Sequence, residues 1–132
     1  MERTLVIIKP DAVNAKHIGD IVSVYENNGL SIEKMKMMHA NEELLKNHYK
    51  EHIDKSFYPS LIEFILSGKI VVMEIVGEDA VDKVREINGA TDSVKAKKGT
   101  IRNLYGATIQ QNAVHGSANI IDANRELNIW FA

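Results

Sequence analysis

TLVIIK, the stretch from Thr4 to Lys9, decides the fold of this chain. Its residues are almost all aliphatic or β-branched, and Pro10 follows at once. A continuous apolar run of this length predicts a strand that is buried on both faces. Proline has no backbone N–H, so it ends the strand. We therefore expect a sheet whose central strand is covered from two sides.

Helices and strands are expected to alternate around this strand. Apolar residues recur at helical spacing over residues 18–28, and Asn28-Gly29 is a good C-terminal stop. Asn41 can cap a helix with Glu42 and Glu43 in its first turn. The expected elements are strand 4–9, helix 18–28, strand 30–38, helix 41 to about 52, helix 59–67, strand 70–76, helix 78–88, strand 112–115 and helix 122–131. This order predicts a mixed α/β layer.

Periodicity fails between residue 90 and about residue 111, where Gly, Thr, Asp, Ser, Lys and Gln dominate. A loop this long inside a compact domain is uncommon and is usually functional or disordered. We expect the chemistry of the protein here.

Composition limits the class of protein. A chain of 132 residues has room for one domain, so residues 1–132 are expected to form a single unit. The net charge of −2 gives no general attraction to nucleic acid or anionic membrane, so any anion site must be local. The absence of cysteine excludes thiol chemistry and is compatible with a cytoplasmic location. The longest stretch without charged side chains, 103–121, is polar throughout, so no membrane span is expected.

Phosphoryl transfer needs several cationic and hydrogen-bonding groups around an anionic substrate. The chain has no P-loop and no protein-kinase glycine loop. The candidates are therefore scattered: Lys9, Arg85 and Arg102 as cations, and Thr91 and Asn112 as neutral donors. Each also has an ordinary alternative. Lys9 can be a solvated strand end, and Arg85 can be an exposed helix residue paired with Glu78, Asp82 or Glu86. Spacing alone does not show that they converge.

His115 is the most interesting of the five histidines. It precedes Gly116-Ser117 near the end of the long loop. A neutral imidazole is a competent phosphoryl acceptor, and Ser117 or Glu126 could orient it. The alternative is a turn or core-edge histidine. The other four, His17, His39, His48 and His52, are assigned to surface or packing roles; His48 and His52 have an i, i+4 spacing but no metalloprotease context.

Five groups of residues are similar to signatures of one family. They are RTLVIIKPDAV (3–13), HYKEH (48–52) with FYPSLIEFILSG (57–68), REINGATDS (85–93), KGTIR (98–102), and NAVHGSAN (112–119) with RELNIWF (125–131). In this order and over nearly the full length, the chain resembles nucleoside diphosphate kinases. The resemblance implies a ferredoxin-like βαββαβ sandwich (α/β, more strictly α+β) with a four-stranded antiparallel sheet and additional helices.

The resemblance also implies a function. The terminal phosphate of a nucleoside triphosphate, typically ATP, passes to a nucleoside diphosphate by a ping-pong mechanism through phosphorylated His115, which maintains the NTP and dNTP pools. Glu126 and Ser117 orient His115, and Lys9 assists catalysis. Phosphates and ribose are contacted by Lys9, Tyr49, Arg85, Thr91, Arg102 and Asn112, while Phe57, Leu61 and Ile109 flank the base. Mg²⁺ is the expected cofactor, bound mainly through the nucleotide phosphates rather than by the protein.

The chain departs from the family pattern in three places. Ala118 and Asn119 follow His-Gly-Ser where an aspartate is usual, Gln111 replaces a common basic residue, and the sequence stops at Ala132 without a longer tail. Metal handling is expected to be altered. The loop over residues 90–116 usually lies at subunit contacts in this family, so a homo-oligomer is expected, a hexamer first and a tetramer second.

Two other classes of protein stay open from the sequence. One is a nucleotide-binding module that has kept the fold and lost catalysis, for which Ala118 is the support. The other is a ferredoxin-like nucleic-acid-binding domain, but 6% aromatic residues, a negative net charge and aliphatic strands argue against it. No specific nucleic-acid partner is therefore expected.

Overall fold

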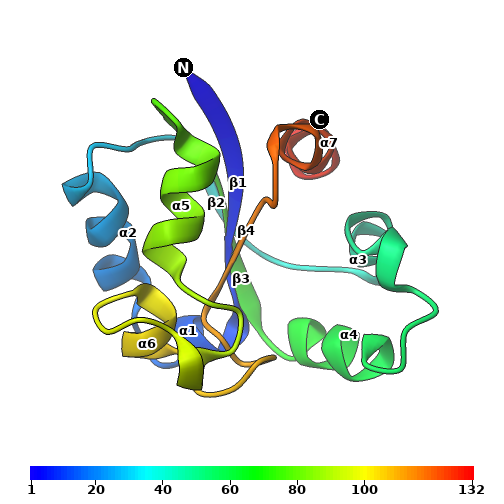
Figure 1. Cartoon of the computed structure of the whole chain (residues 1–132). Coiled ribbons are helices and arrows are strands. Elements are labelled where there is room, and N and C mark those ends of the chain that lie inside the picture. Colours follow the sequence, from blue (N-terminus) through cyan, green and yellow to red (C-terminus); the bar gives the residue numbers. More distant parts are fainter.

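A four-stranded antiparallel sheet lies at the centre of the computed structural model, which describes all 132 residues (Figure 1). The strands are β1 (Glu2–Ile8), β2 (Ser31–His39), β3 (Lys69–Gly77) and β4 (Val114–Gly116), in the order β2-β3-β1-β4. β1 pairs along its whole length with β3 and through its last three residues with β4. The βαββαβ sandwich implied by the family resemblance is confirmed.

Helices cover both faces of this sheet (Figure 1). On one face lie α1 (Pro10–Asn14), α2 (Ile18–Asn27), α5 (Ala80–Asn88) and α6 (Ile101–Tyr105). On the other lie α3 (Glu42–His48), α4 (Tyr58–Leu66) and α7 (Ile120–Trp130). None of these helices is both long enough and apolar enough to span a membrane.

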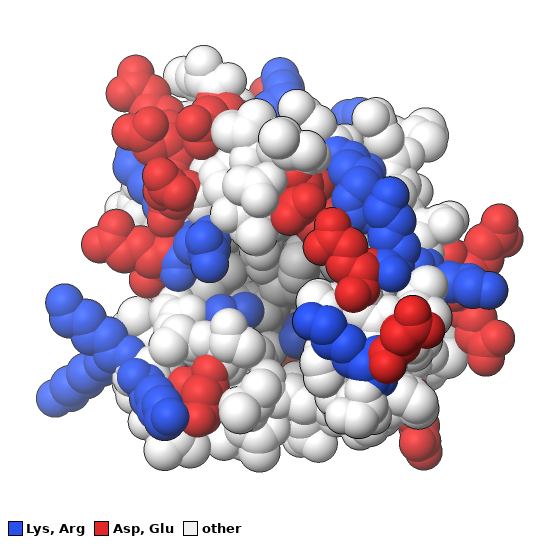
Figure 2. Space-filling view, turned by 45° about the vertical axis from the view of Figure 1, so that its right-hand side comes forward, with Lys and Arg blue, Asp and Glu red and all other residues white.

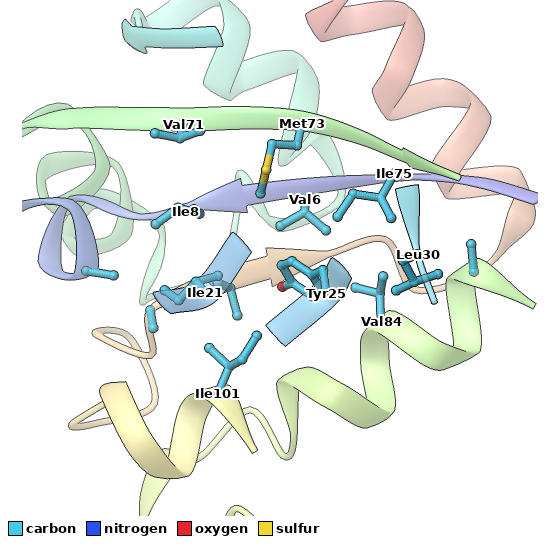
Figure 3. Close-up of a cluster of buried hydrophobic side chains, with 14 residues drawn as sticks. Val6, Ile8, Ile21, Tyr25, Leu30, Val71, Met73, Ile75, Val84 and Ile101 are labelled. Carbon is cyan, nitrogen blue, oxygen red and sulfur yellow. The ribbon is translucent and has the colours of Figure 1, made fainter. Parts of the chain in front are cut away.

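The side chains of β1 alternate between the two apolar cores. Val6 and Ile8 pack with α2 and α5 residues on one face (Figure 3), whereas Leu5 and Ile7 pack with α3, α4 and α7 residues on the other. All four are buried, and each burial stabilises the fold by about 1.5–3 kcal/mol before the entropy of ordering is subtracted. The prediction of a central strand buried on both faces is confirmed.

Side-chain caps set where several helices begin. Asn41 accepts the backbone N–H of Leu44, as predicted, and starts α3. Asn119 does the same for Asp122 and starts α7 directly after β4. Such caps satisfy backbone donors that have no partner within the helix. α7 then packs on β1, on the same face of the sheet as α3 and α4.

Several boundaries predicted from the sequence were wrong, and one region was predicted as a loop that contains helical turns. The first strand ends at Ile8 rather than at residue 9, because Pro10 begins α1 as well as ending the strand; a proline suits the first helical position. The helix that Asn41 caps ends at His48 and is followed by a 3₁₀ turn, Lys50–His52. The last strand is Val114–Gly116 rather than 112–115. The region 90–111 is not without structure: it contains a 3₁₀ turn, Ser93–Lys95, and α6, which at five residues is too short to show a helical period.

Candidate active site

A cavity of about 840 Å³ is lined by residues of α4, α5 and α6 and of the segments between them. Figure 2 shows this face of the molecule, hollowed at its centre, with lysine and arginine atoms around the hollow. The structure brings into this one cavity His115 and all nine residues expected to contact a nucleotide: Lys9, Tyr49, Phe57, Leu61, Arg85, Thr91, Arg102, Ile109 and Asn112. Ser117 and Glu126 are buried behind His115.

His115 lies on β4, opposite Ile7 of β1, and a carboxylate fixes its ring. Glu126 Oε1 lies 2.8 Å from His115 Nε2 and also accepts the Ser117 hydroxyl at 2.8 Å. Burial raises the pKa of Glu126, but hydrogen bonds from His115 and Ser117 and the nearby imidazole charges outweigh it and lower that pKa to about 2. An ionised carboxylate can only accept hydrogen bonds. His115 Nε2 must therefore carry the hydrogen, which leaves the lone pair of a neutral ring on Nδ1.

His48 is a residue of this site that the sequence did not reveal, and His52, which received the same assignment, lines the cavity. We assigned His48 a surface or packing role, yet its buried ring lies 4.6 Å from the ring of His115, at 75° to it. Burial and the charge of His115 hold the pKa of His48 well below its usual value. Trp130 Nε1 donates to His48 Nδ1 at 3.1 Å. A buried histidine at the end of a short helix has no periodic signal that separates it from a packing residue.

Lys9 follows β1 directly and points its charge into the cavity region. Its ammonium group donates to Asn112 Oδ1 at 2.8 Å. Burial, and then the charge of Arg102, lower the pKa of Lys9 to about 8, although Asp11 partly opposes this. The alternative of a solvated strand end is therefore wrong, because only 7% of Lys9 is exposed.

Arg102 is held in place by hydrogen bonds to two backbone carbonyl groups. One guanidinium nitrogen donates to the carbonyl of Gly89 and the other to that of Val114, both at 2.8 Å, while Nε is buried without a partner. Gly89 has a φ of +86°, and a Cβ there would lie 2.5 Å from Thr100 Oγ1. Only glycine fits that position without strain.

Arg85 on α5 is exposed and donates to the backbone carbonyl of Ala118 at 3.2 Å. It is an exposed helix residue, as predicted, but it forms no ion pair with Glu78, Asp82 or Glu86, so the predicted pairing is wrong. Its charge is therefore available at the cavity.

The side chain of Asn112 hydrogen-bonds to three other residues that line the cavity. Its amide nitrogen donates to the carbonyls of Thr91 and Ile109, and its oxygen accepts from Lys9. A single buried amide thus joins the end of β1 to two parts of the long loop.

The other end of the cavity is apolar. Phe57, from the start of α4, is 46% exposed, and Ile109, from the loop, is 62% exposed, whereas Leu61, which also lines the cavity, is buried. Gln110 and Ser60 hydrogen-bond to each other, which links the loop to α4. Exposed aromatic and aliphatic faces of this kind can flank a flat ring.

The three residues that depart from the family pattern, Gln111, Ala118 and Asn119, have different structural settings. Asn119 serves as the cap of α7. Gln111 is exposed and does not line the cavity, while Ala118 does. The site therefore differs from the usual pattern chiefly at Ala118, where no carboxylate is present beside Arg85.

The protein itself offers few ligands for a divalent ion. Glu86 is the one acidic residue among those that line the cavity. Ligand atoms of His48, His115 and Glu126 lie within 4.8 Å of one another, but two of the three residues offer nitrogen, and His115 Nε2 and Glu126 Oε1 are already hydrogen-bonded to each other. Mg²⁺ prefers six oxygen ligands. These residues do not fit an all-protein magnesium site.

A histidine with one free nitrogen, three cations around it and an apolar slot beside it define an enzyme that handles a flat, anionic substrate. The sequence matches the family model described as nucleoside diphosphate kinase over residues 2–132. The chain is 45% identical over 131 residues to the nucleoside diphosphate kinase of Clostridium perfringens (strain SM101 / Type A), covering 99% of this chain and 92% of that one.

Solved structures give the same result. The apo nucleoside diphosphate kinase from Encephalitozoon cuniculi superposes with a TM-score of 0.97 at 35% identity, covering 99% of this chain and 89% of that one. The enzyme from Halobacterium salinarum in complex with CDP has a TM-score of 0.95 at 43% identity, covering 98% and 87%.

This chain belongs to the nucleoside diphosphate kinase family. It is thus a phosphotransferase, and the general mechanism of its family is ping-pong transfer through a phosphohistidine. Members of the family act on nucleotides and generally use a divalent metal ion. The two alternatives from other classes, the catalytically inactive binding module and the nucleic-acid-binding domain, are set aside.

Proposed function

We propose that His115 is the residue that carries the phosphate between a nucleoside triphosphate, typically ATP, and a nucleoside diphosphate. The observation that supports this most strongly is the chain of hydrogen bonds from Ser117 through Glu126 to His115. It leaves Nδ1 with a lone pair, which is what a phosphoryl acceptor needs. In the first half-reaction Nδ1 forms a bond to the γ-phosphorus as the bond to the β–γ bridging oxygen breaks. In the second, a β-phosphate oxygen of the acceptor takes the phosphorus and the N–P bond breaks.

The cations of the cavity stabilise the charge that moves in both steps. Lys9, Arg85 and Arg102 come from three different elements and all line the cavity with His115. Fixed positive groups aimed at a transferring phosphoryl group are usually the largest contribution to such catalysis. Tyr49, Thr91 and Asn112 complete the contacts to phosphates and ribose.

The base is held by Phe57, Leu61 and Ile109. Contact with apolar faces does not distinguish hydrogen-bonding edges, so purines and pyrimidines, with ribose or deoxyribose, are all accepted. Donor and acceptor therefore use the same site in turn, and the enzyme balances the NTP and dNTP pools.

Mg²⁺ is the proposed divalent ion. With a single carboxylate among the lining residues, most of its ligands would be phosphate oxygens and water. Bound there, it would neutralise part of the phosphate charge.

The enzyme is further proposed to be a single-domain, cytoplasmic homo-oligomer, a hexamer before a tetramer, without a nucleic-acid partner. Apolar side chains that stand out from the segment 90–116 support an oligomer: Val94 is 81% exposed and Leu104 is 54% exposed. Contact with a second subunit would cover such exposed apolar side chains. Light scattering at several protein concentrations would measure the subunit number.

The phosphoenzyme itself tests the proposal. The protein is incubated with γ-labelled ATP and Mg²⁺, and we expect an adduct that acid destroys, base preserves and GDP discharges. His115→Ala should carry no label, whereas His39→Ala, a change of an exposed histidine at the end of β2, should label normally. An unlabelled wild-type protein, or a labelled His115→Ala variant, would contradict the assignment.

A further inference from the structure

The buried pair of Trp130 and His48 has no place in the mechanism described so far. The indole nitrogen of Trp130 donates to His48 Nδ1 at 3.1 Å, and both residues are buried. An indole N–H can only donate, so the nitrogen it faces must hold a lone pair. A neutral His48 ring must then carry its hydrogen on Nε2.

The groups packed around His48 come from several elements. His115 faces it from β4, Glu126 and Arg125 from α7, Lys9 from the end of β1, and Tyr49 is its neighbour in sequence. Glu126 favours a positive charge on His48, whereas the cations and burial oppose it. The tryptophan is itself anchored, because Lys36 of β2 donates to its backbone carbonyl. The indole N–H is thus a fixed donor to a buried ring whose surroundings, taken together, oppose a positive charge.

We propose that Trp130 is a positioning residue for phosphoryl transfer: its N–H holds His48 in the neutral Nε2–H form, and this keeps the Glu126 carboxylate for His115. The inference rests on the proposed role of His115 as the phosphoryl acceptor.

The protonation state of His48 matters because His48 and His115 can compete for the carboxylate of Glu126. Ligand atoms of His48, His115 and Glu126 all lie within 4.8 Å of one another. A cationic His48 would be a charged donor that competes with the neutral His115 ring for Glu126, and hydrogen bonds that involve ionised groups are about twice as strong as neutral ones. A carboxylate drawn to His48 would release Nε2 of His115. The lone pair of His115 would then no longer be fixed on Nδ1.

Nitrogen-15 NMR of the unmodified protein measures the state of His48 directly. The chain has five histidines, so their side-chain spectra can be assigned by single substitutions. We expect His48 to stay neutral, with an unprotonated, hydrogen-bonded Nδ1, from pH 5 to pH 8. A protonated Nδ1 in this range would overturn the proposal. This measurement involves no turnover, so it is independent of the test of His115.

A change of one atom in Trp130 tests the consequence for catalysis. It is the only tryptophan in the chain, so a tryptophan auxotroph grown on 3-benzothienylalanine replaces that residue alone and exchanges its N–H for sulfur. Without this hydrogen bond the neutral form of His48 is less stable, so the fall of kcat at acidic pH (the acidic limb of its pH profile) should begin about 0.7 pH units higher, which corresponds to about 1 kcal/mol. KM should not change, because neither residue of the pair is among the proposed nucleotide contacts.

His48→Gln supplies the matched control. Glutamine still offers an acceptor for the indole N–H but cannot ionise, so the same replacement of Trp130 should leave the acidic limb of this variant unmoved. An unmoved limb in the protein that keeps His48, or an equal shift in His48→Gln, would overturn the proposal. Loss of the phosphohistidine adduct in the wild type would instead remove the proposed function and leave the NMR result standing.

Discussion

Replacing Glu126 by glutamine removes one charge at nearly constant volume, and the structure sets the size of the effect. The Oε1 atom of Glu126 accepts two hydrogen bonds of 2.8 Å, from His115 and from Ser117. A charge-assisted hydrogen bond exceeds a neutral one by about 1–1.5 kcal/mol. Losing that excess twice costs about 2–3 kcal/mol, which is about 30- to 150-fold in rate. The amide can also present N–H to His115, which would move the ring hydrogen to Nδ1 and block attack.

The assay is the rate at which ATP phosphorylates the enzyme in a single turnover, quenched with base. We expect Glu126→Gln to lower this rate by the calculated factor without changing nucleotide affinity, because Glu126 does not line the cavity. Ser117→Ala is the matched comparison: it removes one of the two charge-assisted bonds and keeps the carboxylate on His115, so it should cost about 1–1.5 kcal/mol, or about five- to twelvefold. A rate for Glu126→Gln within threefold of the wild type would refute the argument that the carboxylate fixes the tautomer of His115.

Three further predictions concern other parts of the site. Burial lowers the pKa of Lys9 to about 8, so the affinity for nucleoside diphosphates, measured by calorimetry, should fall above pH 8 as the side chain loses its charge. The pKa of Lys9 is higher in the unfolded chain, so the contribution of this group to the free energy of unfolding should rise as the pH increases from about 8 to 10.5. A Lys9→Met variant that keeps the same alkaline fall would show that another group is responsible. Gly89→Ala should lower the stability to thermal unfolding by about 1–3 kcal/mol, because the residue has a positive φ and no space for a Cβ. Gly19→Ala, on α2 with open space around it, should instead raise it by about 0.5–1 kcal/mol, and equal effects of the two changes would contradict the assignment. Ala118→Asp should lower the Mg²⁺ concentration for half-maximal activity by about threefold, as one water-bridged contact would, and an unchanged Mg²⁺ titration would show that Ala118 is neutral.

The sequence was most informative where local physics leaves few choices. The run over residues 4–9 is apolar at every position that a two-sided core requires, and the structure buries it from both sides. Asn41 was a sound cap because its side chain acts on a backbone donor three residues away. Short elements were missed because they carry too few residues to show a period. The five-residue helix α6 depends instead on a cap at Thr100 and on contacts with distant segments.

The site could be predicted by residue type but not by geometry. Lys9 and Asn112 are 103 positions apart and meet through one hydrogen bond of 2.8 Å. Periodicity and composition carry no information about such a pair, so the family resemblance was needed to bring the candidates together. His48 escaped even so, because its importance comes from the ring beside it and not from its place on α3.

Arg102 shows why binding and folding cannot be separated in this site. Two of its donors satisfy the carbonyls of Gly89 and Val114, which belong to the wall of the cavity and to β4. Unpaired buried carbonyls cost about 1–3 kcal/mol each, so the guanidinium stabilises the wall before any phosphate arrives. Its charge nevertheless has no carboxylate partner within 4.0 Å. The protein therefore keeps a fixed, uncompensated cation beside His115. The conformational entropy of this side chain is lost when the chain folds, so phosphate binding does not have to order it.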